Sequence, residues 1–531
     1  MEGVRYVRSI EKEKIMHRKL CLKRKWTGGE VKIFFYSLMV ISLMALWTNP
    51  GMAREFELGG KPVTVMGYLN QSFGFGVAGK NDFDTKQAYQ SALMQGLLEL
   101  EVDLNRNLRF FGSVGLNVDW AYPTLQRDSE WRDKDFDKSY DNLFIFGEGR
   151  DIIQELHTTW TPKDWFLRAG KQIVVWGETD GFRLMDQINP LDQRRGLGDI
   201  EFENTVLPLW LLRAEYYVPL DSSWLQDLGF EFIFNPNPDF RGDEALVPGN
   251  DESGIWAPMI KIRQGGDYSY LGSFNASIDE PTDWSSEGFE YGLRIKSVIK
   301  DTIITLNGFY GRDNLPALLA ENRLPQVEQN DWDGRTVIHP YFKGYYPLFR
   351  FVGFTLTKDF QNLYFSKLGG VAPVLRVEAF YAFNNTFVTA GNTYSKNDEM
   401  RYSIGIDWKV WIRPINPRAA FMISPQFFHR YIRDHEQDLT YDGKKVRKDN
   451  YSASLLLNTT YFHNKVQPVF FWLRDISQKS NFFKIQCTYE HSDIWSYTLG
   501  TLLFNGAKTG QGFQPLTNKD QVFFTVGYRF Q

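Results

Sequence analysis

Cysteine is nearly absent from this 531-residue sequence, and so are the motifs that hold metals. The two cysteines are Cys21 and Cys487, and neither stands at a zinc-type spacing from another cysteine or a histidine. We therefore expect no disulfide framework, no metal and no cofactor. The formal net charge of −4 lacks the basic excess of proteins that bind nucleic acid, so we expect no nucleic-acid partner.

Signatures of catalysis are also missing. None of the seven histidines belongs to a recognisable triad motif such as Gly-x-Ser-x-Gly. Nucleophilic hydrolysis requires a nucleophile, a base and an orienting group within reach of one another. The sequence therefore predicts that the protein is not an enzyme.

Long apolar runs are absent with one exception, IFFYSLMVISLMALW at residues 33–47. This run follows a basic stretch, and Gly51 and Ala53 supply small residues at the −3 and −1 positions of a cleavage site. Because a spanning helix needs about 20 residues, we interpret residues 1–53 as a signal peptide cleaved after Ala53. A retained N-terminal anchor is the alternative. The segment holds ten Lys/Arg and four Asp/Glu, so residues 54–531 carry −4 minus 6, or −10.

What the sequence does contain is long two-residue alternation. In SALMQGLLELEVDL, residues 91–104, one parity is apolar and the other is polar and largely acidic. The pattern recurs at 108–122, 288–299, 374–383 and 482–490. Strands of soluble proteins usually have about 5 or 6 residues, whereas a tilted strand needs about 10 to cross a bilayer. Strands can span lipid only in a closed barrel, so we predict a transmembrane antiparallel β-barrel whose charged parity faces inward.

The alternation places eighteen strands along residues 54–531, with sixteen as the alternative because residues 165–177 and 466–475 alternate poorly. Strand centres fall near residues 70, 98, 114, 156, 171, 212, 231, 293, 306, 353, 379, 406, 426, 456, 470, 486, 499 and 525. Short periplasmic turns are predicted at 105–107, 161–164, 299–301, 412–418, 462–466 and 491–493. Long external loops are predicted at 121–151, 178–206, 236–287, 312–346, 385–400 and 433–450. Residues 256–277, inside one of these loops, could hold another pair of strands.

The C-terminal stretch VFFTVGYRF, residues 522–530, has one apolar parity with aromatic residues. It resembles the signal by which the barrel-assembly machinery recognises outer-membrane barrels, although Gln531 follows the last aromatic residue. The resemblance implies a location in the outer membrane of a Gram-negative bacterium. Outer-membrane lipid and the assembly machinery are the expected partners.

Three stretches resemble an uncharacterised family of Gram-negative porin-like barrels, known only as a domain of unknown function. They are LRAGKQIVVWGETDGFRLMDQINPLD (167–192), PVLRVEAFYAFNNTF (373–387) and RYSIGIDWKVWIRPINPRAAFMISPQFF (401–428). The resemblance implies an outer-membrane barrel that moves small organic or lipid-like compounds.

The charged parity supplies the candidate pore-lining residues, because a channel selects by its diameter and by the charges on its wall. These residues are Glu99, Glu101, Asp103, Arg109, Asp119, Glu155, His157, Arg213, Glu215, Glu231, Arg294, Arg376 and Glu378. The alternative is that such groups only pair with one another across neighbouring strands.

Residues 176–204 form the third external loop and carry charges of both signs, with glycines that ease folding back into the lumen. We interpret this stretch as a candidate constriction loop, and an ordinary solvated loop is the alternative. Its charged candidates are Glu178, Asp180, Arg183, Asp186, Asp192, Arg194, Arg195 and Asp199.

Together these features predict a porin-like channel for small organic or lipid-like solutes. An importer of hydrophobic compounds and a surface-binding or adhesion barrel are the alternatives. Aromatic residues near the inner parity would serve such an importer: Phe111, Phe380, Phe428, Phe470 and Trp472. The sequence leaves the solute, the direction of transport and the oligomeric state open.

Overall fold

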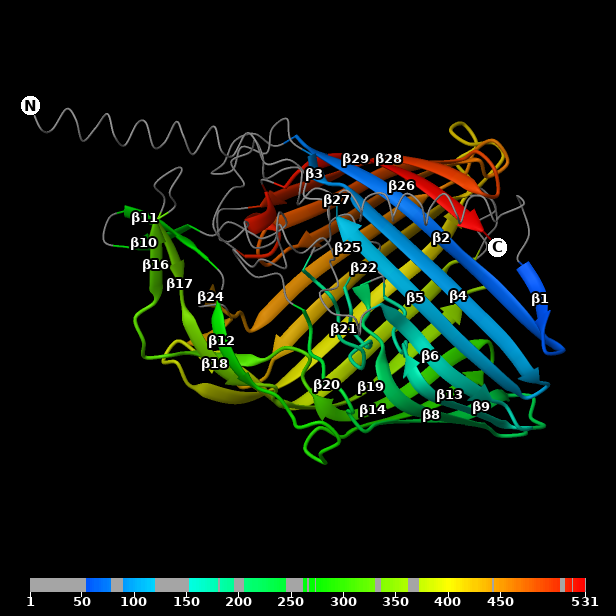
Figure 1. Cartoon of the computed structure of the whole chain (residues 1–531), viewed down its shortest axis with the longest axis horizontal. Helices are drawn as coiled ribbons and strands as arrows, with labels where there is room; N and C mark the ends of the chain where they lie inside the picture. Colours follow the sequence, from blue (N-terminus) through cyan, green and yellow to red (C-terminus); the bar gives the residue numbers. More distant parts are fainter. Residues whose placement is uncertain are drawn as a thin grey trace, which may run out of the picture.

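The computed structural model describes residues 54–77, 89–119, 152–179, 182–194, 205–244, 261–264, 267–272, 274–329, 336–361, 372–441, 444–506, 511–517 and 519–530. Within these residues the protein is an all-β structure whose main body is one antiparallel barrel (Figure 1). The proposed signal peptide, residues 1–53, lies outside the described residues.

No helix among the described residues is long and apolar enough to cross a membrane.

Eighteen strands form the barrel, and each predicted strand centre falls within one of them. In chain order they are β2 (Lys61–Gly76), β4 (Leu93–Asn105), β5 (Leu108–Asp119), β6 (Ile153–Trp160), β7 (Trp165–Gln172), β8 (Leu209–Tyr217), β9 (Leu225–Asn235), β13 (Glu290–Ile299), β14 (Thr302–Arg312), β19 (Leu348–Asp359), β20 (Val374–Thr389), β21 (Tyr394–Val410), β22 (Phe421–Ile432), β25 (Asp449–Asn458), β26 (Val466–Asp475), β27 (Ser480–Glu490), β28 (Trp495–Gly506) and β29 (Gln521–Phe530). The weakly alternating stretches 165–177 and 466–475 supply β7 and β26, which settles the count at eighteen rather than sixteen.

The barrel closes between its first and last strands. β2 pairs with β4 on one side and with β29 on the other, in a register that runs from Gly67 opposite Phe530 to Gly76 opposite Gln521. Every neighbouring pair in the ring is antiparallel, so no barrel strand is left with an unpaired edge.

The two faces of the wall differ as the alternation predicts. On the outer face, Leu499 is 59% exposed, and Leu212, Leu293 and Leu306 are similarly exposed. On the opposite parity, Glu231 and Glu378 are buried inside the barrel. Successive side chains of a strand point to opposite sides, so the apolar parity forms a continuous outer belt suited to lipid.

The two ends of the barrel also differ (Figure 1). One end has short turns, such as the Lys300–Asp301 turn between β13 and β14, where both residues have positive φ as tight hairpins require. The other end carries the long loops. One predicted loop is wrong: within 385–400, β20 continues to Thr389 and β21 begins at Tyr394. Its polar composition indicated a loop, but the paired strands simply extend past the apolar belt.

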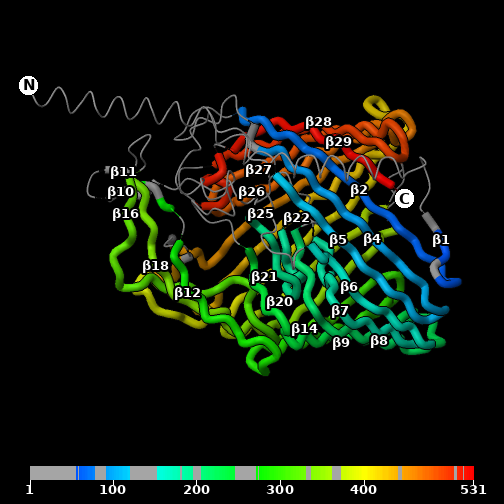
Figure 2. Tube along the Cα trace, in the orientation of Figure 1, coloured from blue at the N-terminus to red at the C-terminus, as the bar shows by residue number. Residues whose placement is uncertain are grey.

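Two small sheets project from the long-loop end, at the left in Figure 1 and Figure 2. One contains β10 (Lys261–Gln264), β11 (Asp267–Leu271), β17 (Thr336–His339) and β16 (Gln326–Gln329). The other contains β12 (Asn275–Asp279), β18 (Tyr341–Tyr345) and β15 (Ala317–Ala320). The extra pair considered for 256–277 therefore exists as β10 and β11, but outside the barrel. Short accessory strands β1 (Arg54–Leu58), β3 (Tyr89–Ser91), β23 (Leu439–Tyr441) and β24 (Lys444–Lys445) extend the main sheet.

Candidate functional site: a loop packed inside the barrel

The segment between β7 and β8 runs back inside the barrel. Its side chains Leu184, Met185 and Ile188 are buried in one cluster with inward-facing wall residues. Five of those wall residues are phenylalanines, contributed by β14, β19, β20 and β22: Phe309, Phe349, Phe351, Phe380 and Phe428. We call residues 173–179 and 182–194 the inner segment. It covers an aromatic part of the wall that would otherwise face the lumen.

Two glycines of the wall make room for the inner segment. A Cβ added at Gly292 would lie 2.9 Å from Cη2 of Trp176, and one added at Gly353 would lie 2.8 Å from Cε of Met185. Both distances are shorter than normal carbon contacts, so larger residues would push the segment away. The wall is thus shaped to hold this segment.

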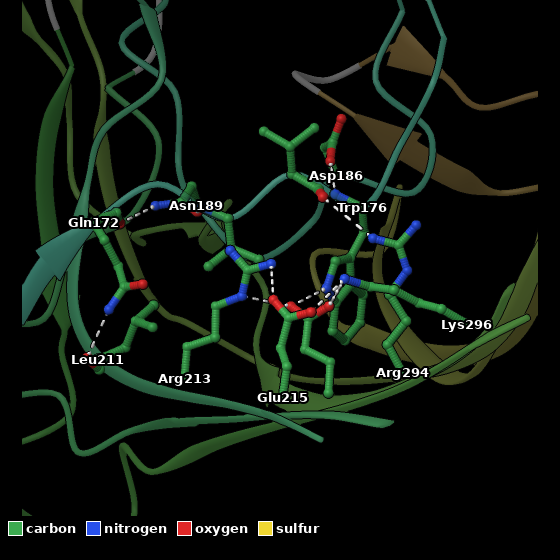
Figure 3. Close-up of polar contacts among 12 residues, drawn as sticks. Gln172, Trp176, Asp186, Asn189, Leu211, Arg213, Glu215, Arg294 and Lys296 are labelled. Atoms are coloured by element: carbon green, nitrogen blue, oxygen red, sulfur yellow. Dashed lines mark hydrogen bonds and ion pairs between the residues drawn. The ribbon is translucent and has the colours of Figure 1, made fainter. Parts of the chain in front are cut away.

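Asn189 fastens the two limbs of the inner segment together (Figure 3). Its Oδ1 accepts the N–H of Val174 at 2.8 Å, and its Nδ2 donates to the carbonyls of Gln172 at 3.3 Å and Leu207 at 2.9 Å. The side chain is buried, and a buried amide with three partners fixes one conformation.

A second turn of the segment is closed by Asp186. One carboxylate oxygen accepts the backbone N–H groups of Trp176 at 2.6 Å and Gly177 at 2.7 Å. The indole Nε1 of Trp176 then donates to Oε1 of Glu231 on the wall at 3.2 Å. Opposite it, the Nη1 atom of Arg294 donates to the carbonyl of Val175 at 3.3 Å.

Glu378 on β20 is the main attachment at the far side of the barrel. Its two carboxylate oxygens accept the backbone N–H groups of Glu178 and, at 3.2 Å, Met185. Arg376 donates to the carbonyl of Glu178, and the hydroxyl of Thr357 donates to the side-chain carboxylate of Glu178. The segment is therefore attached to strands on both sides of the aromatic wall.

Below the inner segment, four charged side chains form a closed cluster of two cations and two anions (Figure 3). Arg213 lies 2.6 Å from Glu215 and 3.0 Å from Glu231. The Nζ atom of Lys296 lies 3.0 Å and 2.9 Å from the same two carboxylates. We call these residues the four-charge cluster. Because their charges cancel, it presents dipoles rather than a net charge to the lumen.

Two further ion groups lie on β20, β21 and β22. Arg376 lies 2.8 Å from Asp407, whose oxygen also accepts the hydroxyl of Ser424 at 2.6 Å. Glu399 is fully buried between Arg401 and Arg430, and its Oε1 lies 2.6 Å from Nε of Arg430. Such pairing supplies the compensation that a buried carboxylate needs.

The inner segment also meets the next long loop. Asp243 accepts the N–H of Leu191 at 2.7 Å and the side chain of Gln193 at 3.1 Å. Burial raises the pKa of Asp243 to about 6, although the Leu191 N–H and the charge of Arg183 act in the opposite direction. Burial likewise lowers the pKa of Arg183, whose Nη2 donates to the carbonyl of Asn189 at 2.5 Å.

The structure places all thirteen candidate pore-lining residues on barrel strands, on the face opposite the apolar belt. Arg213, Glu215, Glu231, Arg294, Arg376 and Glu378 meet around the inner segment. The others lie on β4, β5 and β6; of these, Glu155 also contacts the segment, because its carboxylate accepts the N–H of Ile173 at 3.1 Å. There Arg109 pairs with Glu101 at 3.0 Å and Asp103 at 2.8 Å near the short-turn end. Whether they line an open pore stays a prediction.

Further along the same part of the wall, His157 stacks on Phe111 and lies 3.8 Å from Glu155. Asp119 accepts the N–H of Ala92 at 2.9 Å near the long-loop end. Glu99 is half-buried on β4.

The candidate loop charges divide into two groups. Glu178 and Asp186 make the contacts already described, and Asp192 pairs with Arg194 at 2.6 Å with both side chains buried. Asp180, Arg195 and Asp199 lie outside the described residues.

Some residues of the site were not on the candidate list. Lys296 shares the parity of Arg294, so the alternation could have identified it. Trp176 and Asn189 stand in an aperiodic stretch that gives no such signal. Phe470 and Trp472 are a wrong prediction: they pair with outward residues, including Ile485, and so lie on the outer face. Three consecutive aromatic residues in VFFWL had hidden the parity of that strand.

The fold and the inner segment define a large membrane-type β-barrel that carries a loop in its interior. The chain belongs to the family described as "Protein of unknown function (DUF1302)", which matches residues 60–530 and confirms the expected resemblance. No curated protein matches the chain.

Solved structures with a similar fold are outer-membrane barrels. OccAB4 of Acinetobacter baumannii is 10% identical, with 91% of this chain and 100% of that chain covered at a TM-score of 0.45. OccK5 (OpdH) of Pseudomonas aeruginosa is 9% identical, with 88% and 98% covered at 0.41. The outer membrane channel DcaP of A. baumannii is 9% identical, with 90% and 100% covered at 0.37. These likenesses concern the fold alone and carry no argument about the site.

Proposed function

We propose that the protein is a channel of the Gram-negative outer membrane that passes small organic solutes past the inner segment. The observation that carries this proposal is the position of residues 173–179 and 182–194. They are packed inside the barrel, held by Glu378 on one side and Glu231 on the other. A loop fixed within a barrel reduces the free cross-section, and pore diameter is the first determinant of selectivity.

The surface chemistry supports this location. The outer belt of exposed leucines would be unstable in water, whereas a closed barrel with such a belt is stable in lipid. The aromatic C-terminal strand, β29, resembles the signal that barrel-assembly machinery recognises, and it closes the barrel against β2. Both features support the outer membrane, with the short turns on the periplasmic side.

The charges near the inner segment bear on the solute. The four-charge cluster offers two cations and two carboxylates within one small area. Such a surface can exchange hydrogen bonds with polar and zwitterionic groups without repelling either sign of charge. It therefore favours small solutes that carry polar groups of both kinds.

A second candidate, an importer of hydrophobic compounds, is favoured by the aromatic wall. Five inward phenylalanines, together with Leu209, Leu211 and Ile233, make this part of the inner face apolar, whereas the interior of outer-membrane barrels is usually polar. If the inner segment moved, an apolar solute could take the place of Leu184, Met185 and Ile188 against these rings.

Solute flux into liposomes separates these functions. Vesicles with the purified barrel should admit small polar organic solutes and exclude solutes too large for the narrowed lumen. Saturable binding of an apolar fluorescent probe, abolished by Phe351→Ser and Phe380→Ser, would instead support the importer. Vesicles as tight as protein-free controls would reject the channel.

A further inference from the structure

Two neighbouring short turns form one rigid surface. The turn between β21 and β22, residues 411–420, is joined to the turn between β25 and β26, residues 459–465, by Asn416. Its Nδ2 donates to Oγ1 of Thr459 at 2.9 Å and to the carbonyl of Thr460 at 2.8 Å. Its Oδ1 accepts two backbone N–H groups of its own turn at 3.1 Å. Asn416 itself is buried, so the two turns have a fixed relation.

This surface exposes apolar side chains in a way that folding does not require. Ile415 is 60% exposed and Phe462 is 70% exposed. Phe462, His463 and Asn464 have φ values of 52°, 58° and 66°, in the left-handed region that disfavours side chains with a Cβ. A tight turn requires such φ values, but it does not require a phenylalanine at the first of them, and Phe462 is left exposed there. Its exposed ring is suited to a contact outside the folded chain.

The same surface is positively charged. Arg413, Arg418 and Lys465 are exposed, and none of them has an ion-pair partner among the described residues. Neither turn contains an acidic residue. The acidic residue that hydrogen-bonds to this surface is Glu490, through its N–H to the carbonyl of Lys465. Its carboxylate pairs with Arg529 at 3.1 Å.

We call these five exposed residues the turn patch: Arg413, Ile415, Arg418, Phe462 and Lys465. The patch lies just beyond the strands at the end of the barrel where the C-terminal strand ends (Figure 1). Exposed tryptophans mark that end of the outer face: Trp160, Trp165, Trp224 and Trp495. Tryptophan is enriched where acyl chains meet headgroups, which puts the turn patch at the depth of the lipid headgroups.

We propose that the turn patch binds the headgroups of anionic phospholipids in the leaflet at the short-turn end. Arg413, Arg418 and Lys465 would meet the phosphates, while Ile415 and Phe462 enter the upper part of the acyl layer. Cations at this depth are attracted to anionic lipid. Two exposed apolar side chains are too few for a stable protein interface, which covers about 800 Å² on each partner. Phospholipid therefore fits the patch better than a protein does.

Lipid retention by the purified, folded full-length barrel tests this proposal. The barrel is incubated with equal amounts of phosphatidylglycerol and phosphatidylcholine, and the bound lipids are counted by native mass spectrometry. In the variant with Arg413→Gln, Arg418→Gln and Lys465→Gln, the preference for phosphatidylglycerol should fall about 100-fold, because each cation near an anionic lipid surface contributes about 1 kcal/mol. High salt should lower the preference of the unaltered protein in the same direction.

The control variant also loses three positive charges, but from other short turns, through the substitutions Arg106→Gln, Lys163→Gln and Lys300→Gln. These residues are also exposed, but they lie on turns without the two apolar tips, and the charge of Lys163 is already paired with Asp164 at 3.5 Å. The control should keep the preference, and both variants should show the heat-dependent gel shift of a folded barrel. Equal losses in the two variants would overturn the proposal by showing a generic charge effect. An unchanged preference in the patch variant would also overturn it.

Discussion

Removing Glu378 should release the inner segment without unfolding the barrel. Its carboxylate accepts the backbone N–H groups of Glu178 and Met185, and hydrogen bonds to a charged acceptor contribute about 1.5–3 kcal/mol each. Part of this gain is offset because burying the carboxylate is itself unfavourable. A net loss of about 2–4 kcal/mol for Glu378→Ala corresponds to about a 30- to 1,000-fold rise in the displaced population of the segment.

Single-channel recordings in planar bilayers measure that population directly. Glu378→Ala should show frequent substates of higher conductance, and Glu378→Gln should be intermediate because it keeps one acceptor oxygen. Glu101→Ala is the matched control, since this carboxylate pairs with Arg109 near the short-turn end and has no contact with the segment. Identical substate frequencies in all three variants would refute the role of Glu378.

Three further results are expected. Leu499→Arg should destabilise the barrel by about 2–4 kcal/mol, because Leu499 lies on the apolar belt near the middle of β28. Gln486→Arg, on the inner face, should fold normally, and the folded fraction on unheated gels measures the difference. Lys296→Met should shift the reversal potential in a salt gradient toward cation selectivity, because the carboxylates of Glu215 and Glu231 lose a positive partner. An unchanged reversal potential would show that ions do not pass the four-charge cluster. The pKa of Asp243 is raised to about 6 in the folded state, so the folded protein binds this proton more tightly and gains stability as the pH falls from 7.5 toward 5. In Asp243→Asn, the unfolding midpoint should lack this gain at low pH.

The barrel could be predicted from the sequence because lipid imposes a strict two-residue period. Each inward or outward position is set by parity alone, so even the weakly alternating β7 and β26 were assigned to strands. The prediction failed in stretches where apolar and polar residues do not alternate. Phe470 and Trp472 belong to a run of consecutive aromatic residues, and residues 385–400 are mostly polar because these parts of the strands extend past the apolar belt.

The interior of the barrel was harder to predict because loops have no period. Charges and glycines marked residues 176–204 as a candidate, but not the contacts that hold the segment. Those depend on Asn189 and on Gly353, whose roles appear only when distant strands come together. The Asp192–Arg194 pair shows the same limit: two charges predicted as candidates of the constriction loop are buried against each other.

Replacing residues 182–194 with a short Gly/Ser linker tests the central claim that the inner segment narrows a conducting lumen. The exchange removes Leu184, Met185 and Ile188 from the aromatic wall and leaves all eighteen barrel strands intact. Single-channel conductance of the purified variant in planar bilayers should rise severalfold over that of the unaltered protein, with the heat-dependent gel shift preserved. An equal conductance, or no conductance from either protein, would contradict the account.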